Sequence, residues 1–448
     1  YAYDAADPQY ADLYGAPHTP GAPATREFQD TWLAMVGEAV RKYRPDLIWF
    51  DFELGSVISP EYQQAMFAGV YNLAARDGRE IGVAHKHREI HAHTGILDFE
   101  RGLEDRLTPY PWLTDTSIGP WFHHRDARYV SADSLIDMLA DIVSKNGCML
   151  LNAGPKSDGT FTPEAADLLR EIGAWLKING EAIYDTRPWL AFGEGATRMG
   201  GGAFSEHTGK FTGTDLRFTR SKDGKTVYVI ALDWPGREIP VSSFKVERAA
   251  AAAKAELLGY GPVEFKVDGR ARLAILLPER DRAPACRHAY AVKLTGFDLA
   301  WHPDARFAQR CVTLEPARAT LGGGKIRTQV NEGRENIGFW DSAAEKIHWL
   351  VPAAEAGDYR LRAEVSSAYG RSALKATVAG QERTAEVPKT DGWFAPVFVE
   401  LGNVRIETPG VYHLVLAPAD PDRWRAVNVY GLQFGPSGDS HRFPAGNR

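Results

Sequence analysis

The feature of this sequence that most constrains its fold is a change of hydrophobic period near residue 195. Between residues 26 and 180, apolar residues recur at helical spacing and alternate with short apolar runs, which is typical of parallel strands covered by helices. From Gly195 onward, apolar and polar residues alternate with a period of two, which is typical of antiparallel strands. The chain has 448 residues, too many for one hydrophobic core, so we expect two or three domains.

The first part predicts alternating helices and strands in residues 1–190. The expected elements are helices at 26–42, 60–76 and 132–143 and from Pro163, with strands at 46–51, 80–84 and 148–152 and an extended piece ending at Asp98. About four strands precede Trp189, whereas a closed barrel has eight strands in roughly 250 residues. We therefore expect the C-terminal portion of a (β/α)8-type barrel. The chain opens on Tyr1 without Met, which suggests that the upstream half of the barrel is missing.

The second part predicts two all-β modules. Residues 191–297 should form an antiparallel β-sandwich, with Asp223-Gly224 at a hairpin turn. Within it, the alanine-rich run 249–255 is expected to be a surface excursion. Residues 298–448 contain cleanly alternating segments and should form a jelly-roll module.

Composition excludes several classes of function. With 52 basic and 58 acidic residues, the net charge is −6 and no long run of like charges occurs, so nucleic acid is not expected as a partner. No stretch reaches the roughly 18 apolar residues of a membrane span. The three cysteines lack the spacing of a metal site, and no metal or cofactor is expected. The oligomeric state is left open.

Acidic residues near strand ends are the candidates for chemistry. Hydrolysis of a glycosidic bond with retention needs two carboxyl groups roughly 5 Å apart, one as nucleophile and one as acid/base. Asp51 ends an apolar strand, where barrel enzymes place catalytic groups, and Glu53 competes with it. Glu100 and Glu104 follow the extended piece that ends at Asp98. From the residues alone, a helix cap or a solvated loop explains these acids as well.

Five ordered segments resemble motifs of the α-L-fucosidases of glycoside hydrolase family 29. They span about 140 residues and are more specific together than any one alone. The segments are Trp49-Phe-Asp51, Asp98-Phe-Glu-Arg-Gly102, Pro111-Trp-Leu-Thr-Asp-Thr-Ser-Ile-Gly119, Leu150-Leu-Asn-Ala-Gly-Pro-Lys-Ser-Asp-Gly159 and Trp175-Leu-Lys-Ile-Asn-Gly-Glu-Ala-Ile-Tyr184.

The resemblance implies a retaining exo-α-L-fucosidase that acts on fucosylated oligosaccharides or glycoconjugates by double displacement. Asp51 is then the nucleophile, and Glu100 is the first choice for the acid/base, with Glu104 as the alternative. Trp121 should form the apolar wall for the C5 methyl group of fucose, and Trp49 should line the sugar beside the nucleophile. The family also implies an extracellular or periplasmic location.

Departures from the family pattern leave alternatives open. The family's His-His-Asp-Gly-Phe segment does not occur, and the cluster of His85, Lys86, His87, His91 and His93 is expected to be a solvated loop. A retaining glycosidase with another sugar preference and a non-catalytic carbohydrate-binding protein are the competing functions.

The last module resembles galactose-binding-like carbohydrate-binding modules in its strand order and in the pattern Asn336-Ile-Gly-Phe-Trp340. Trp340, Trp393 and Trp424 are its candidates for exposed aromatic residues. A sugar-binding role and a purely structural one both stay open.

Overall fold

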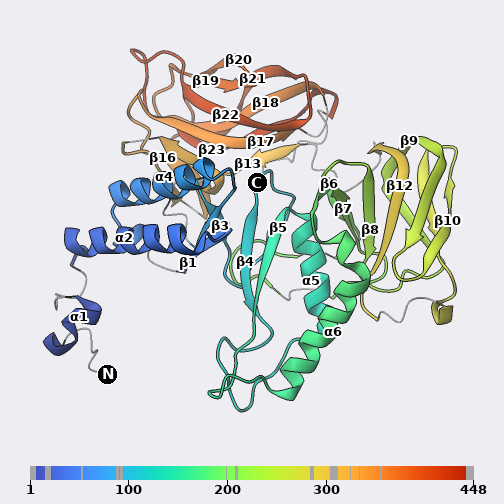
Figure 1. Ribbon diagram of the computed structural model, residues 1–448. Helices are drawn as coiled ribbons and strands as arrows, with labels where there is room; N and C mark the ends of the chain where they lie inside the picture. Colours follow the sequence, from blue (N-terminus) through green and yellow to red (C-terminus); the bar gives the residue numbers. More distant parts are fainter. Residues whose placement is uncertain are drawn as a thin grey trace. The chain divides into compact units, whose positions relative to one another are not determined.

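The structure is a computed structural model in which the chain forms two compact units, Tyr1–Asp98 and Phe99–Arg448. The elements are labelled in Figure 1. The structure describes residues 7–15, 22–51, 54–86, 90, 94–197, 199–206, 210–282, 287–302, 311–322, 324–331, 333–353 and 356–439.

The first unit contains parallel strands with their connecting helices. Its elements are η2 (Pro8–Tyr10), α1 (Ala11–Tyr14), α2 (Arg26–Tyr43), β1 (Leu47–Phe50), α3 (Leu54–Val57), α4 (Pro60–Arg76), β2 (Gly82–His85) and β3 (Ile96–Asp98). β1 pairs in parallel with β2, and β2 with β3. The Thr25 hydroxyl caps α2 by accepting from the Phe28 amide at 3.2 Å. Val40, Met66 and Val83 belong to the core that joins the helices to the strands. The predicted helices and strands of this part are confirmed.

The second unit continues the pattern with β4 (Trp112–Ser117), α5 (Ala132–Ser144), β5 (Gly147–Asn152), α6 (Pro163–Asn179) and η3 (Gly180–Ala182). β4 and β5 are parallel. The chain thus has a half-barrel of five parallel strands, one more than the sequence predicted. β4 escaped prediction because its polar residues are buried, and hydrogen bonds satisfy them. The Thr114 hydroxyl donates to the Phe99 carbonyl at 2.8 Å, and the Ser117 hydroxyl donates to the Asn152 carbonyl at 3.2 Å.

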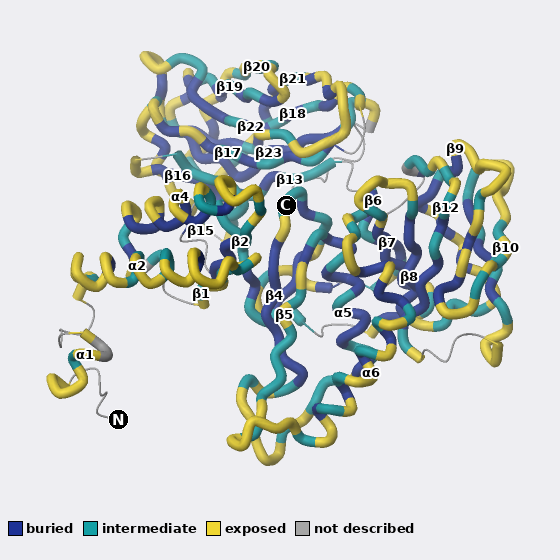
Figure 2. The backbone as a smooth tube through the Cα atoms, viewed as in Figure 1, coloured by how far each residue is buried: buried dark blue, intermediate teal, exposed yellow. Residues whose placement is uncertain are grey.

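The next module is a seven-stranded antiparallel sheet in the order β10-β11-β9-β12-β8-β7-β6. Its elements are β6 (Thr186–Glu194), β7 (Leu216–Ser221), β8 (Thr226–Ala231), β9 (Glu238–Leu257), β10 (Gly261–Val267), β11 (Arg272–Leu276), η4 (Arg280–Arg282) and β12 (Tyr290–Trp301). The turn between β7 and β8 contains Gly224 at φ 72°, as predicted. The alanine-rich run is part of β9, so the expected surface excursion is wrong. Pairing with β10 and β12 holds this run extended, although most of it is exposed (Figure 2).

The last module has two antiparallel sheets, β15-β16-β23-β18-β21 with β13 beside β23, and β14-β17-β22-β19-β20. The elements are β13 (Val312–Leu314), η5 (Pro316–Arg318), β14 (Thr320–Gly322), β15 (Arg327–Asn331), β16 (Arg334–Gly338), β17 (Lys346–Ala353), β18 (Gly357–Ser366), β19 (Ser372–Val378), β20 (Gln381–Val387), β21 (Val397–Ile406), β22 (Gly410–Pro418), β23 (Asn428–Pro436) and η6 (Ser437–Asp439). One hydrophobic core contains inward residues of both sheets (Figure 2).

Two of the tryptophans predicted to be exposed in this module are in its core. Trp340 and Trp424 are buried, and the centres of their rings lie 4.7 Å apart. The indole Nε1 of each donates to a backbone carbonyl, Trp340 to Glu345 and Trp424 to Trp340. Trp393 is partly buried. Exposed aromatic side chains of the module are instead Phe339, Tyr369 and Phe394.

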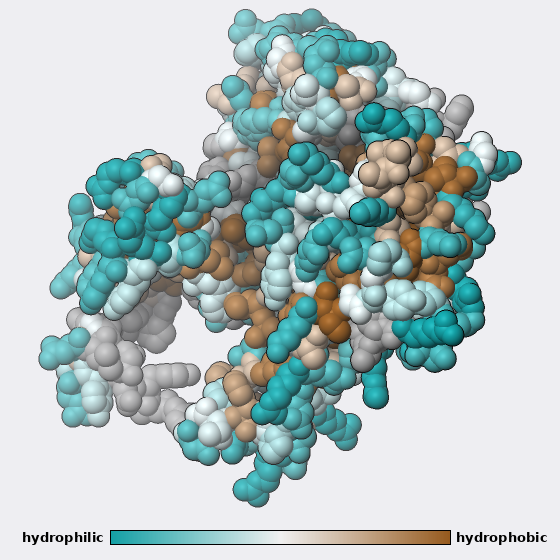
Figure 3. Space-filling view, turned by 45° about the vertical axis from the view of Figure 1, so that its right-hand side comes forward, coloured by the Kyte–Doolittle hydropathy of each residue, from teal (hydrophilic) through white to brown (hydrophobic). Residues whose placement is uncertain are grey.

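Side chains of α6 bind the seven-stranded antiparallel sheet of the second unit. Trp175 Nε1 donates to the Ala289 carbonyl at 2.8 Å, and Asn179 Oδ1 accepts from the Ala291 amide at 3.3 Å. Both residues lie in the last family-like segment, so the segment joins the half-barrel to β12. Among the described residues, no helix is long and apolar enough to cross a membrane. The face in Figure 3 is largely hydrophilic, with smaller apolar areas between.

Candidate active site

The ends of three parallel strands bring four side chains together in the first unit. Trp49 lies in β1, Asp51 follows β1, Lys86 follows β2, and Asp98 ends β3. Trp49 Nε1 donates to Asp98 Oδ2 at 2.7 Å. Lys86 Nζ lies 3.7 Å from Asp51 Oδ1, 3.8 Å from Asp98 Oδ2 and 5.5 Å from the centre of the Trp49 ring.

The residues of this cluster differ in burial: Lys86 and Asp98 are enclosed, whereas the Asp51 carboxylate is accessible. The side chains of Lys86 and Asp98 are 3% and 0% exposed, whereas that of Asp51 is 56% exposed. A buried ammonium is costly unless carboxylates compensate its charge, and here two of them do. Asp51 therefore lies beside a buried cation and is still accessible to solvent.

The sequence prediction of a solvated loop is wrong for His85 and Lys86, because both residues are buried. His87, His91 and His93 lie outside the described residues, as does Glu53, the competitor of Asp51. The signal for Lys86 is positional, since it directly follows the strand Gly82–His85 and barrel enzymes place catalytic groups at such C-terminal strand ends.

In the second unit, Glu100 lies on the loop that runs along β4. The Phe99 amide donates to the Leu113 carbonyl at 2.9 Å, and the Arg101 amide donates to the Asp115 carbonyl at 2.8 Å. Glu100 itself is partly buried, and Arg101 has a φ of 46°, so the chain turns sharply directly after Glu100. The loop thus places Glu100 near the C-terminal half of β4.

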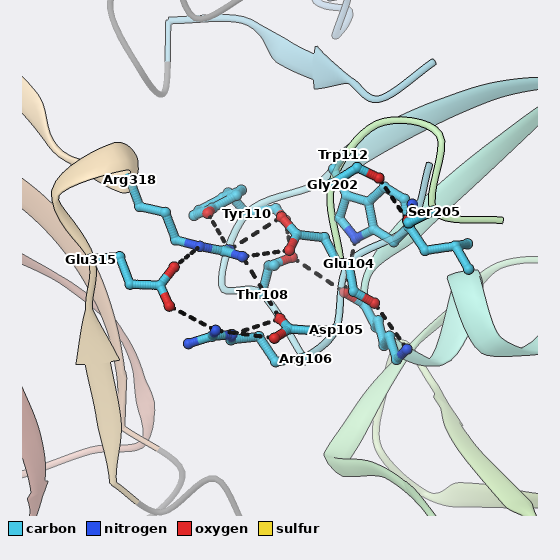
Figure 4. Close-up of polar contacts among 12 residues, drawn as sticks. Glu104, Asp105, Arg106, Thr108, Tyr110, Trp112, Gly202, Ser205, Glu315 and Arg318 are labelled. Carbon is cyan, nitrogen blue, oxygen red and sulfur yellow. Dashed lines mark hydrogen bonds and ion pairs between the residues drawn. The ribbon is translucent and has the colours of Figure 1, made fainter. Parts of the chain in front are cut away.

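Glu104 has a different environment, shown in Figure 4. Both of its carboxylate oxygens accept from Arg318, at 3.1 and 2.5 Å, and the Glu104 side chain is 2% exposed. Arg318 also donates to the Tyr110 hydroxyl at 2.9 Å and contacts Glu315. Glu104 therefore fastens the loop to the last module, which supplies Arg318.

The pKa of Glu104 and its geometry point in different directions. Burial raises the pKa of Glu104, against the opposing effect of Arg318, and a raised pKa would suit a catalytic acid. A carboxyl group enclosed by a bidentate arginine, however, cannot reach a glycosidic oxygen. A proton donor must touch the leaving group, so the contact with Arg318 makes Glu104 the weaker candidate despite its raised pKa.

Trp121 is held in place from two sides. The Arg101 guanidinium carbon lies 5.5 Å from the centre of the Trp121 ring. Asn152 Nδ2, at the end of β5, donates to the Trp121 carbonyl at 2.9 Å. A Cβ on Gly154 would approach the Phe122 backbone to 2.7 Å, so only glycine allows this loop to lie so close. The Asn152-Ala-Gly154 motif thus positions the Trp121 loop.

Glu206 is a further residue of this region that the sequence analysis did not single out. It accepts from Arg101 Nε at 2.5 Å and from the Thr116 hydroxyl. It lies between β6 and β7 in a glycine-rich segment without a periodic pattern, so no signal in the sequence marked it.

Among the described residues, no group of three His, Cys, Asp or Glu side chains could hold a metal ion.

Two family models match the chain. The model of α-L-fucosidase matches residues 1–181, and the model of the α-L-fucosidase C-terminal domain matches residues 210–295. Curated relatives include plasma α-L-fucosidase of Pongo abelii, 27% identical over 273 residues, which are 58% of this chain and 54% of the relative. Tissue α-L-fucosidase of Homo sapiens is 29% identical over 268 residues, 58% of this chain and 53% of the relative. The chain spans about half the length of the curated relatives it matches.

Solved structures that resemble the chain include Thermotoga maritima α-fucosidase in complex with fucose. The sequence identity is 24% and the TM-score is 0.46, over 64% of this chain and 59% of that structure.

Proposed function

Because this chain belongs to the α-L-fucosidase family of glycoside hydrolases, we propose that it supplies the catalytic carboxyl groups of a retaining exo-α-L-fucosidase. The observation that carries the proposal is the position of Asp51. It is an accessible carboxylate at the C-terminal end of a parallel strand, beside the buried Lys86. Trp49 lies in the same strand and donates to Asp98. The substrate is a terminal α-L-fucoside of an oligosaccharide or glycoconjugate.

The reaction proceeds in two displacements. In the first, an oxygen of Asp51 attacks the anomeric carbon while Glu100 donates its proton to the glycosidic oxygen. The bond between the anomeric carbon and that oxygen breaks, the aglycone leaves as an alcohol, and fucose is bound to Asp51 as an ester. In the second, Glu100 removes a proton from water, the water oxygen attacks the anomeric carbon, and the ester bond breaks. Two inversions release fucose with its original configuration.

The choice of Glu100 over Glu104 follows from their surroundings. Arg318 donates to both oxygens of Glu104, so moving Glu104 to a substrate would break two charge-assisted hydrogen bonds and leave the buried carboxylate without them. Glu100 lies beside the C-terminal half of β4 and belongs to the family-like segment Asp98–Gly102. Trp121 is proposed to face the C5 methyl group of fucose with the ring surface that Arg101 does not cover, and Trp49 to line the sugar beside Asp51.

The test uses an aryl α-L-fucoside and added azide. Hydrolysis is measured for this chain, alone and extended by a complementary N-terminal half-barrel, and for Asp51→Ala and Glu100→Ala of the active form. Azide should restore turnover of both variants, since a small anion fits where the carboxylate was. Asp51→Ala should yield the β-fucosyl azide, and Glu100→Ala the α-fucosyl azide.

Glu104→Ala is the matched control, and azide should not restore its turnover. If azide restores Glu104→Ala and not Glu100→Ala, the assignment of the acid/base is wrong. If the active form prefers an aryl galactoside, the proposed sugar preference is wrong. Fucose binding without turnover in every form would favour a carbohydrate-binding protein. Export from the producing cell, which the family implies, is a separate proposal that cell fractionation tests.

A further inference from the structure

The sandwich domain reaches the loop that carries Glu100 through residues 202–206. Backbone hydrogen bonds join the two segments. The Gly202 amide donates to the Leu103 carbonyl at 2.8 Å, and the Leu103 amide donates to the Gly202 carbonyl at 3.2 Å. The Phe204 amide donates to the Glu100 carbonyl at 2.8 Å. Since β4 borders the other side of the loop, Glu100 lies between β4 and segment 202–206.

Glycine at position 102 is required for this close approach. A Cβ on Gly102 would lie 2.3 Å from the Gly202 carbonyl oxygen and 2.8 Å from Ala203 Cα, both of them backbone atoms that cannot rotate away. Gly202 and Ser205 lie beside the loop in Figure 4, and the Leu103 amide also donates to the Ser205 hydroxyl at 3.1 Å. The segment is therefore fitted against the loop along its length.

Glu206 ends this segment and holds Arg101 in two ways. Its amide donates to the Arg101 carbonyl at 3.2 Å, and its carboxylate accepts from Arg101 Nε at 2.5 Å. The second carboxylate oxygen accepts from Thr116, a fully buried residue of β4. The Glu206 side chain is 7% exposed, so water screens this ion pair little. Arg101 in turn lies over Trp121.

We propose that Glu206 is a positioning residue for catalysis, through which the sandwich domain fixes the orientation of Glu100. The inference rests on the proposed function. Glu206 fixes both the main chain and the side chain of Arg101, the residue directly after Glu100, at a left-handed φ that a non-glycine residue adopts only when held. Without the carboxylate of Glu206, Arg101 loses its partner, the turn relaxes, and Glu100 moves from the leaving oxygen.

The test exploits the dependence of acid catalysis on the leaving group. Glu206→Gln is made in the form of the protein that hydrolyses aryl fucoside, and kcat/KM is measured with a dinitrophenyl fucoside and with a fucosyl disaccharide. The disaccharide needs a proton from Glu100 and the dinitrophenyl group does not. We expect a loss of about tenfold to a hundredfold for the disaccharide and less than about threefold for the dinitrophenyl fucoside. Glu206→Asp should lie between Glu206→Gln and the unsubstituted protein.

Glu194→Gln is the matched control, because Glu194 is a buried carboxylate of the same domain whose oxygens accept from Ser242 and Ser243. It should lower both substrates equally or neither. Should Glu206→Gln fail to fold, Gly102→Ala carries the test, since its methyl group displaces segment 202–206 and should give the same split between substrates.

An equal loss for both substrates in Glu206→Gln, or no loss, would overturn the role of Glu206 and leave the proposed function intact. Absence of turnover in the unsubstituted protein with either substrate would overturn both.

Discussion

Replacement of Asp137 by asparagine should stabilise the protein relative to the unsubstituted form, by an amount that grows as the pH rises. Asp137 lies on α5 where this helix packs against β6 and β7, and it is 5% exposed. Its Oδ1 has no hydrogen-bond partner among the residues that the structure describes. Burial, together with the negative charge of Asp133, raises the pKa of Asp137 from 3.8 to about 8, against the opposing charge of Arg217. Asp215 and Asp233 add smaller effects in the same upward direction.

The sign and size of the effect follow from proton linkage. Below pH 4 the carboxyl group is protonated in the folded and unfolded states, so its contribution to stability is fully present. As the pH rises, the unfolded state ionises first and the folded state is disfavoured, until the folded group ionises near pH 8. Each pH unit between the two pKa values is worth about 1.4 kcal/mol. At pH 7 the loss is about 4 kcal/mol, a figure good to its order of magnitude.

Asp137→Asn keeps the shape of the protonated acid and removes the ionisation. Its free energy of unfolding minus that of the unsubstituted protein should therefore be near zero at pH 4, rise through neutral pH and level off above pH 8. Hydrogen exchange of α5 peptides measures this local free energy in a chain with several cores. Asp167→Asn, an exposed residue of α6 paired with Arg170, is the control and should change stability by less than about 1 kcal/mol without a trend. If Asp137→Asn and the unsubstituted protein have parallel pH curves, the buried acid is not protonated at neutral pH.

Three further predictions concern the site and its supports. Arg318→Met should lower stability by about 3–5 kcal/mol, because it leaves the Glu104 charge buried without a partner, and the double variant with Glu104→Gln should recover most of the loss in thermal unfolding. Gly154→Ala should raise KM for aryl fucoside and change the melting temperature little, since its methyl group displaces the Trp121 loop. An unchanged KM would contradict this. Lys86→Met should lower kcat for aryl fucoside at least about tenfold, because the cation beside Asp51, the proposed nucleophile, is lost; full activity would show that Lys86 only fills space.

Hydrophobic period predicted most of the fold, and it failed where polar residues are buried. Helices such as α2 and α6 have an apolar face and a capping threonine, so both their type and their start were readable from the sequence. β4 has the sequence WLTDTS, which resembles a loop until its hydrogen-bond partners on neighbouring segments are known. Trp340 was misjudged for a related reason. Its indole Nε1 donates to the Glu345 carbonyl within the core, a contact that the sequence pattern does not encode.

The candidate site was predictable only as far as local sequence determines it. Asp51 could be placed at a strand end because a single strand defines that position. Lys86 follows a strand, so its position could be predicted, but its contact with Asp51, 35 residues away, could not. Glu206 contacts Arg101, 105 residues away, and no local pattern encodes that contact. The family-like motifs identified Asn152 and Gly154 without explaining them, and the structure supplies the reason in the Trp121 loop that they hold.

The most direct test of the central claim is to trap the fucosyl ester on the enzyme. A 2-deoxy-2-fluoro-fucosyl fluoride slows both steps and releases a very good leaving group, so the ester should accumulate in the active form of the protein. Mass spectrometry of the digested protein should then locate one fluorofucosyl group on Asp51, and the label should be lost on incubation with an acceptor alcohol. A label on Glu53 or on any other residue, or turnover without a label, would contradict the assignment of Asp51 as the nucleophile.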